Sequence, residues 1–355
     1  MRCGTNTIAI PPGATMREQL ENRKMSQKEF ALRMDLSEKH VSRLINGQVE
    51  LTKDVALRLE SVLGVSANFW NNLEMMYREN LERVKEENEL EEDIKLSDNF
   101  PYSKMAALGW IDASRRKEDR VIHLRRFFEV ASLGVLDKLM IPGIACRRTG
   151  LNEKSNYHLA AWAQKARLEA RQIKTNTINL AKLKQSINLI REMTVQEPSQ
   201  FFSSLVQLFS ESGVALVCLP HIGGSFLHGA SFQDGDRIVM GLTLRGKDAD
   251  RFWFSLFHEL CHVLKGHING LSETKPEYEI EADAFARDVL IPPVEYEKFI
   301  ENASFSRESI ISFADSIYIA HGIVVGRLQN DNYLTYDRLN DLKEQYEFVE
   351  YHGHQ

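Results

Sequence analysis

The chain has 355 residues, of which 43% are hydrophobic and 26% are charged, a globular composition at a length typical of roughly two domains. Its 44 Lys and Arg against 50 Asp and Glu give a net charge of -6, so any nucleic-acid surface must be a local patch. Four scattered cysteines without a C-x-x-C pair exclude a disulfide framework and a thiolate zinc knuckle. No apolar run approaches the roughly 18 residues that a membrane helix needs, so we expect a cytoplasmic protein without a membrane partner.

The first part of the chain reads as short helices separated by polar turns. Ser26 and Glu29 form an S-x-x-E capping signal, and Gly47 and Gly64 follow helical stretches where helix-ending turns are expected. The order SQKEFALRM, a short turn and SEKHVSRLINGQ predicts a helix-turn-helix. Residues 1–72 are therefore predicted to be a DNA-binding domain.

The second helix of this pair is the candidate DNA reader. Its apolar residues are expected to pack inward, which leaves polar side chains to face a major groove, while the start of the preceding helix can hold a phosphate. The predicted contacts are Gln27, Glu38, Lys39, Ser42 and Arg43. Between Met1 and Trp70 there are ten basic and eight acidic residues, a mildly basic balance, so a protein-docking bundle stays open as an alternative.

Residues 11–73 closely resemble the Xre-type helix-turn-helix domain of HigA-like antitoxins. The resemblance implies a five-helix bundle that binds double-stranded operator DNA as a homodimer, with half-sites about one DNA turn apart. It also implies a cognate toxin as a protein partner.

Residues 73–205 are predicted to be a helical connector. Between Asn71 and Phe100, ten acidic residues accompany four basic ones, which is typical of a solvated helix face. The stretch from about residue 99 to residue 198 is rich in helix formers and carries no chemical motif, so we expect it to connect and to pack.

The sequence pattern changes after Pro198. A predicted helix leads into the β-branched run VALVCLP, a glycine-rich segment from His221 to Phe232 and the strand-like RIVMGLTL, and helices dominate from Asp250 onward. The glycine-rich segment is expected to form an edge strand and a loop over which an extended substrate lies. The fold class expected is mainly α with a small α+β domain.

A His258-Glu259-x-x-His262 motif lies in one of these later helices. Because residues four apart share a helix face, the two imidazoles can bind the same metal ion. The Glu259 carboxylate then lies near the open coordination position, where it can act as a general base. A buried histidine pair that bonds to backbone carbonyls is the alternative interpretation.

A catalytic zinc site needs a third protein ligand, and the three-histidine spacing fails by one position. Gly266 and His267 each stand one residue away from where that pattern requires them, so His267 is interpreted as a helix-end residue. In the next helix, Glu279 and Asp283 are one turn apart. This spacing resembles the gluzincin arrangement, in which Glu279 binds the metal and Asp283 accepts the outer N–H of a ligand histidine.

The neighbouring Glu281 is the poorer candidate, since it lies on another side of the helix. A solvated face that carries all of these carboxylates is the alternative.

The segments RFWFSLFHELCHVLKGH and EIEADAFARDVLIPP resemble the ImmA/IrrE metallopeptidases, over roughly residues 213–293. The resemblance implies that His258, His262 and Glu279 bind zinc and that Glu259 is the catalytic base. It also implies cleavage of a protein partner. Residues 206–355 are therefore predicted to be a zincin-like peptidase domain with Zn2+ as cofactor, although such ligands also accept Mn2+ or Fe2+.

Together these features predict a DNA-binding regulator with a zinc-dependent endopeptidase that hydrolyses a peptide bond in a regulatory protein. One alternative is a non-catalytic repressor or antitoxin whose metal domain only binds or senses. Another is a peptidase whose first bundle docks substrate. His228 is interpreted as a surface-loop histidine rather than an oxyanion donor, and His321 and Arg327 receive no role.

Overall fold

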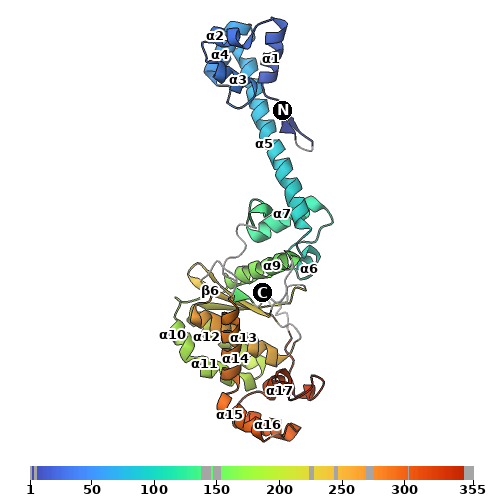
Figure 1. The fold of residues 1–355 in the computed structure, drawn as a ribbon, viewed down its shortest axis with the longest axis vertical. Helices are drawn as coiled ribbons and strands as arrows, with labels where there is room; N and C mark the ends of the chain where they lie inside the picture. Colours follow the sequence, from blue (N-terminus) through green and yellow to red (C-terminus); the bar gives the residue numbers. More distant parts are fainter. Residues whose placement is uncertain are drawn as a thin grey trace, which may run out of the picture. The chain divides into compact units, whose positions relative to one another are not determined.

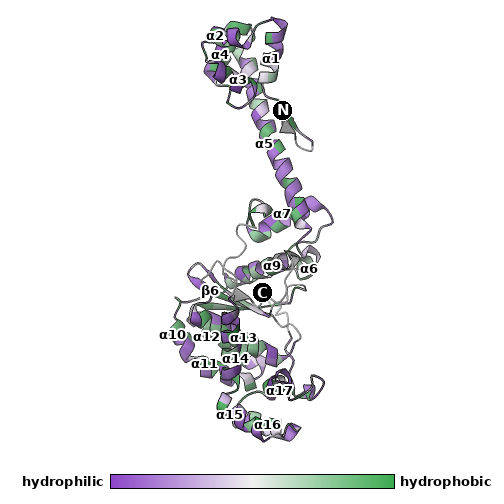
Figure 2. Ribbon diagram, in the orientation of Figure 1, coloured by the Kyte–Doolittle hydropathy of each residue, from purple (hydrophilic) through white to green (hydrophobic). Residues whose placement is uncertain are grey.

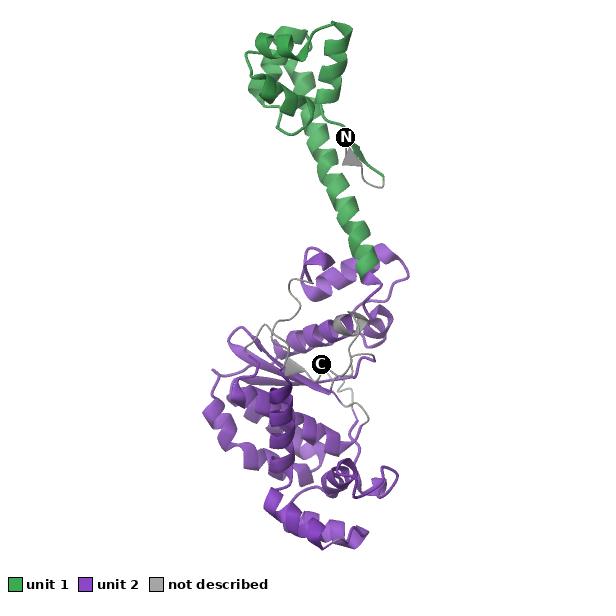
Figure 3. Ribbon diagram, in the orientation of Figure 1, with its two compact units in different colours: residues 1–96 green, residues 97–355 purple. Residues whose placement is uncertain are grey.

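The computed structural model describes residues 2–3, 6–136, 145–146, 153–223, 228–243, 247–268, 275–302 and 304–347. The chain divides into two compact units, unit 1 (Met1–Leu96) and unit 2 (Ser97–Gln355), which are coloured separately in Figure 3. The finer division into 1–72, 73–205 and 206–355 stays a prediction.

Unit 1 is a helical bundle with a small antiparallel hairpin at its start (Figure 1). Its elements are β1 (Arg2–Cys3), β2 (Ile8–Ala9), α1 (Gly13–Asn22), α2 (Gln27–Arg33), α3 (Glu38–Ile45), α4 (Lys53–Leu63) and α5 (Ala67–Ser97), the last of which ends at the unit boundary.

Local signals in the sequence account for the helix ends of unit 1. The Ser26 side chain accepts a hydrogen bond from the Glu29 N–H, and Ser37 and Thr52 begin α3 and α4 in the same way. Gly64 ends α4 in the left-handed region, with φ of 69°. These caps satisfy backbone groups that a helix end leaves without partners.

The core of unit 1 forms where α1 to α4 meet the start of α5. Phe30, Leu59 and Trp70 are buried there, and so are the reader-helix residues Val41, Leu44 and Ile45 that we expected to pack inward. The 31-residue α5 is mainly hydrophilic along its length, as the purple ribbon in Figure 2 shows. The predicted five-helix bundle is confirmed.

The N-terminal hairpin docks onto α5. The backbone N–H groups of Asn6 and Thr7 donate to Glu87 at 2.9 and 3.2 Å, and the Thr7 hydroxyl donates to the same carboxylate at 2.6 Å. Ala9 packs against Tyr77 and Val84. The start of the chain is therefore tied to α5, a contact that nothing in the local sequence indicated.

Unit 2 combines a small sheet with many helices. Its elements are α6 (Tyr102–Ala107), α7 (Lys117–Phe128), η1 (Leu133–Val135), β3 (Ala145–Cys146), α9 (Glu153–Ala170), α10 (Leu180–Gln185), α11 (Ile187–Glu192), η2 (Met193–Val195), α12 (Pro198–Glu211), β4 (Val214–Leu219), β5 (Gly229–Asp234), β6 (Arg237–Thr243), α13 (Ala249–Lys265), α14 (Pro276–Leu290), α15 (Pro293–Glu301), α16 (Arg307–Ser316), α17 (His321–Asn330) and η3 (Asn340–Leu342).

The sheet of unit 2 has the strand order β3-β5-β6-β4, with β4 and β6 parallel and the other pairs antiparallel. The two apolar runs predicted as strands form β4 and β6. The prediction that the glycine-rich segment is an edge strand is wrong for its second half, because β3 pairs with the outer side of β5 at Ser231. Residues 224–227 of that segment lie outside the described residues.

Helices pack on both faces of this sheet (Figure 1). On β6, Met240 and Leu242 join the apolar core that includes Trp253 of α13, whereas the intervening Gly241 meets Trp162 of α9. Since successive strand residues point to opposite faces, α13 and α9 lie on opposite sides. A Cβ at Gly241 would lie 2.5 Å from the Trp162 ring, so only glycine allows this approach.

The fold class is mainly α with a small α+β region, as predicted. Among the described residues, no single helix is long and apolar enough to cross a membrane, and α16 with α17, bent by 115°, passes only as a pair and only by length and composition.

Candidate metal centre

The H-E-x-x-H residues lie on α13, which is buried over most of its length. The His258 side chain is 6% exposed and that of His262 is fully buried. Apolar residues on the same helix hold it in the core of unit 2: Trp253, Leu256, Phe257, Leu260 and Val263. The packing fixes the direction in which both imidazoles point.

Glu279, in the first turn of α14, faces the two histidines. The Nε2 atoms of His258 and His262 lie 3.1 Å apart. The Glu279 carboxylate oxygens lie 3.3 Å from His258 Nε2 and 3.6 Å from His262 Nε2. Two helices thus bring two nitrogens and a carboxylate to one point, with all three donor atoms within 4.8 Å of one another.

These separations fit a small divalent ion. Zinc binds imidazole nitrogen at roughly 2.0–2.1 Å, so two donors on a tetrahedron around it stand about 3.3–3.4 Å apart. The observed distances of 3.1, 3.3 and 3.6 Å bracket that value. Two histidines and one carboxylate also form the type of ligand set that leaves a coordination position open in catalytic sites.

The outer nitrogens of both histidines have partners as well. Asp283, one turn after Glu279, has its Oδ1 at 2.9 Å from His258 Nδ1, where we expected an acceptor for a ligand histidine. His262 Nδ1 lies 3.2 Å from His267 Nδ1. Sequence reasoning missed this second contact; Gly266, which turns the chain back at the end of α13, was the signal for it.

Glu259 lies beside the histidines and is 2% exposed. The Ser231 hydroxyl of β5 donates to Glu259 Oε2 at 2.8 Å. Gly229 on the same strand lies so close that a Cβ there would come within 2.7 Å of Glu259 Cγ. Neither β5 residue was predicted, because their approach depends on how α13 packs on the sheet.

Burial and charge give these groups unusual pKa values. Burial lowers the pKa of His258, but hydrogen bonds to Asp283 and Glu279 outweigh it and raise that pKa to about 9. Burial and the charge of His258 lower the pKa of His262 to about 4. These directions favour a charged His258 and a neutral His262 at neutral pH when no metal is bound. Burial also raises the pKa of Glu259 to about 8.

The predicted DNA contacts lie together on α2 and α3. The side chains of Gln27, Glu38, Lys39 and Arg43 belong to exposed residues, and Ser42 is half-buried. All of them are in unit 1. The structure thus brings the five residues to adjacent helices, and their contact with DNA stays a prediction.

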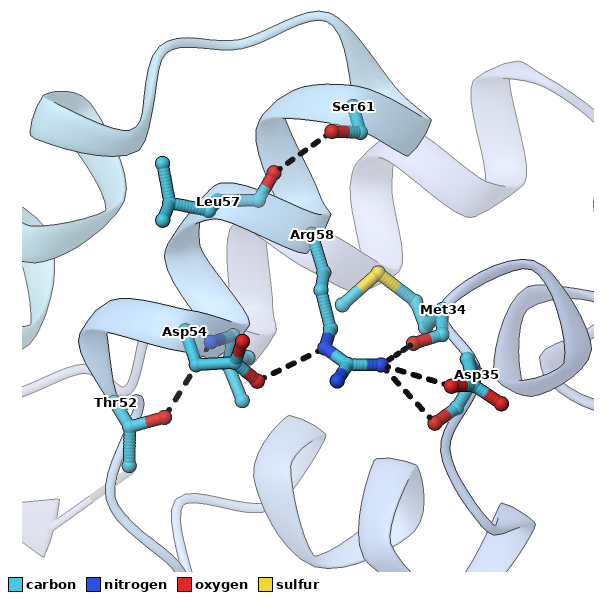
Figure 4. Close-up of polar contacts among 8 residues, drawn as sticks. Met34, Asp35, Thr52, Asp54, Leu57, Arg58 and Ser61 are labelled. Atoms are coloured by element: carbon cyan, nitrogen blue, oxygen red, sulfur yellow. Dashed lines mark hydrogen bonds and ion pairs between the residues drawn. The ribbon is translucent and has the colours of Figure 1, made fainter.

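Arg58 of α4 holds the turn between these two helices (Figure 4). Its guanidinium donates to the carbonyl oxygens of Met34 and Asp35 at 3.0 and 3.3 Å and contacts the Asp35 carboxylate at 3.3 Å. Asp54, one turn earlier on α4, accepts from Arg58 Nε at 2.9 Å. Asp35 has a positive φ of 52°, a backbone conformation that is uncommon for residues other than glycine. Arg58 therefore stabilises the turn at this residue.

Comparison with known proteins identifies both parts of the chain. Residues 16–70 match the helix-turn-helix family. YddM of Escherichia coli, an uncharacterized HTH-type transcriptional regulator, is 36% identical over 63 residues, which are 18% of this chain and 67% of that protein. The chain belongs to the helix-turn-helix family of regulators.

A solved HigA-family addiction-module antidote protein from Coxiella burnetii is 30% identical to this helix-turn-helix protein. That match has a TM-score of 0.22 and covers 24% of this chain and 94% of the other. Residues 227–310 match a peptidase family described as the IrrE N-terminal-like domain. The predicted order of an Xre-type helix-turn-helix domain and an ImmA/IrrE-like domain is confirmed.

The metal cluster, which consists of His258, His262 and Glu279, lies in the IrrE-like part of the protein. A cavity of about 580 Å³ adjoins it. Asp283 and His228 line it, together with Arg327 of α17. Arg327 donates to Asp331 at 2.5 Å and lies over the Tyr296 ring, which gives it a structural role.

His321 lies apart from the cluster. Its Nε2 is 3.0 Å from the Asp315 carboxylate, and its side chain is 38% exposed. This pairing gives His321 a surface contact between α16 and α17.

Proposed function

We propose that this helix-turn-helix protein binds operator DNA through unit 1 and hydrolyses a peptide bond of a protein partner through the cluster on α13 and α14. The observation that carries the proposal is the convergence of His258, His262 and Glu279 beside the buried Glu259. Homodimeric DNA binding and a cognate toxin as partner belong to the same proposal, and the helix-turn-helix family match supports the DNA-binding part.

His258, His262 and Glu279 would hold the metal, and Asp283 would accept the Nδ1–H of His258 and fix its orientation. A zinc ion bound there supplies Lewis-acid chemistry, because it polarises the scissile carbonyl and makes nearby acids easier to deprotonate. Manganese or iron suits the same donor set.

Glu259 would move the proton. Its Oε2 accepts from Ser231, which leaves Oε1 to take a proton from the attacking water and to return it to the leaving amine. Burial keeps bulk water away from this carboxyl group. Its raised pKa in the absence of a metal is consistent with a group that exchanges protons near neutral pH.

The direct test replaces the proposed base and keeps its shape. Glu259→Gln should retain the metal and abolish cleavage, because an amide cannot accept the proton. New protein N-termini are compared, by chemical labelling and mass spectrometry, between cells that produce wild type and cells that produce the variant. Glu277→Gln is the matched control, because it also removes one negative charge but at an exposed residue of α14, and it should behave as wild type.

Wild-type-specific N-termini that disappear with Glu259→Gln and persist with Glu277→Gln support the peptidase. Identical sets of N-termini in all three samples contradict it and favour the binding or sensing alternative.

The proposed operator binding by unit 1 is tested by gel shift with the DNA upstream of the protein's own coding region. Affinity should fall as salt rises, since a protein surface that binds DNA phosphates displaces condensed counterions. Absent or salt-insensitive binding would reject the operator role and favour a docking bundle.

A further inference from the structure

His267 follows the end of α13, and its ring lies against that of His262. Gly266 has a φ of 71°, and the His267 N–H donates to the His262 carbonyl at 2.9 Å, five residues back. This is the hydrogen bond of a Schellman helix end, which folds the chain back on the last turn. The His267 ring thereby reaches His262, with the two Nδ1 atoms 3.2 Å apart.

Two residues of α14 hold the His267 ring in this place. Tyr278 stacks on it with 3.9 Å between ring centroids and 6° between planes. The Glu281 carboxylate lies 3.4 Å from His267 Nε2, and its other oxygen contacts Lys265 Nζ at 2.7 Å. The His267 side chain is 7% exposed, so its orientation is set by contacts rather than by solvent.

The chemistry of the side chains determines which ring nitrogens of His262 and His267 carry a proton. A neutral imidazole has one N–H, so a His262 that binds a metal through Nε2 carries its proton on Nδ1. A carboxylate only accepts, so Glu281 favours the His267 form with the proton on Nε2. His267 Nδ1 is then an acceptor that faces the outer N–H of His262 at 3.2 Å.

We propose that His267 is a positioning residue that orients the metal ligand His262, with Glu281 selecting the required form of its ring. This inference rests on the proposed metal site. It gives each ligand histidine an acceptor at its outer nitrogen, Asp283 for His258 and His267 for His262. Such partners fix ring orientation and raise the basicity of the ligand.

A role of His267 as a metal ligand itself does not fit these contacts. The two nitrogens of His262 lie on different sides of its ring, and His267 approaches the one that faces away from His258 and Glu279. The other nitrogen of His267 faces Glu281.

The test measures the zinc affinity of the full-length protein by competition with a chromophoric chelator. His267→Leu removes the acceptor and should weaken zinc binding roughly 10–100-fold. His267→Asn places an amide oxygen near the position of Nδ1 and should restore most of the affinity. The matched control is His321→Leu, a change of another paired histidine in unit 2, which should leave zinc affinity unchanged.

Unfolding midpoints of the metal-free proteins separate a folding defect from a lost acceptor. Wild-type affinity in His267→Leu, or equal losses in the Leu and Asn variants, would overturn the positioning role alone. A wild-type protein that binds no zinc would instead refute the proposed metal site, so the two failures are distinguishable.

Discussion

Gly229 allows the carboxylate of Glu259, the proposed general base, to approach the sheet. Because a Cβ there would lie 2.7 Å from Glu259 Cγ, Gly229→Ala must displace that side chain. Misplacement of a reacting group by about 1 Å can cost roughly 100-fold in rate, so we expect cleavage to slow about 10–100-fold. The rate of cleavage of the partner identified by N-terminal labelling measures this, with zinc content unchanged.

Gly134→Ala is the matched control, since a Cβ there would lie 3.6 Å from Ser132 Oγ, an ordinary van der Waals distance. Equal cleavage rates for wild type and Gly229→Ala would show that the close approach has no functional consequence.

The spacing of residues predicted the part of the site that lies within single helices. His258, Glu259 and His262 lie within a span of five residues, and Glu279 and Asp283 are one turn apart, so helix geometry alone relates the members of each group. Ser231 reaches Glu259 from a strand 28 residues earlier, and no local spacing encodes that contact. Such contacts depend on packing between elements.

At the scale of elements, Arg58 links α4 to the turn between α2 and α3, and this turn determines the orientation of α3, the candidate DNA-reading helix. Arg58→Met keeps much of the side-chain length but removes the hydrogen bonds to Met34 and Asp35. We expect the turn to loosen and operator affinity to fall roughly two- to tenfold, about the loss of one or two hydrogen bonds. Gel shifts at fixed salt measure the change.

Arg83→Met is the control for Arg58→Met, because Arg83 pairs only with Glu79 of its own helix in the contacts described. Equal operator affinity of Arg58→Met and wild type would contradict the bracing role.

Elements with strong patterns were predicted, and short ones were not. The β-branched runs of β4 and β6 and the capped helices α2 to α4 carry their own signals. The two-residue β3 carries none, since two residues show no period and its pairing depends on β5. The edge-strand prediction failed for this reason.

At the scale of the whole molecule, each unit has its own apolar core. We therefore expect two thermal transitions, of which zinc shifts only the one of unit 2. A free zinc concentration 100 times the dissociation constant should raise the free energy of unfolding of unit 2 by about 2.7 kcal/mol. Scanning calorimetry with zinc and with a chelator measures both transitions, and a shift of the unit 1 transition would contradict this separation.

The central claim is that His258, His262 and Glu279 hold one divalent ion, and zinc content per chain tests it most directly. Glu279→Ala removes a ligand, whereas Glu277→Ala changes an exposed residue two positions earlier on the same helix. Elemental analysis of the purified full-length proteins should find one zinc per chain in wild type and in Glu277→Ala, and far less in Glu279→Ala. Equal zinc in all three proteins, or none in wild type, would contradict the claim.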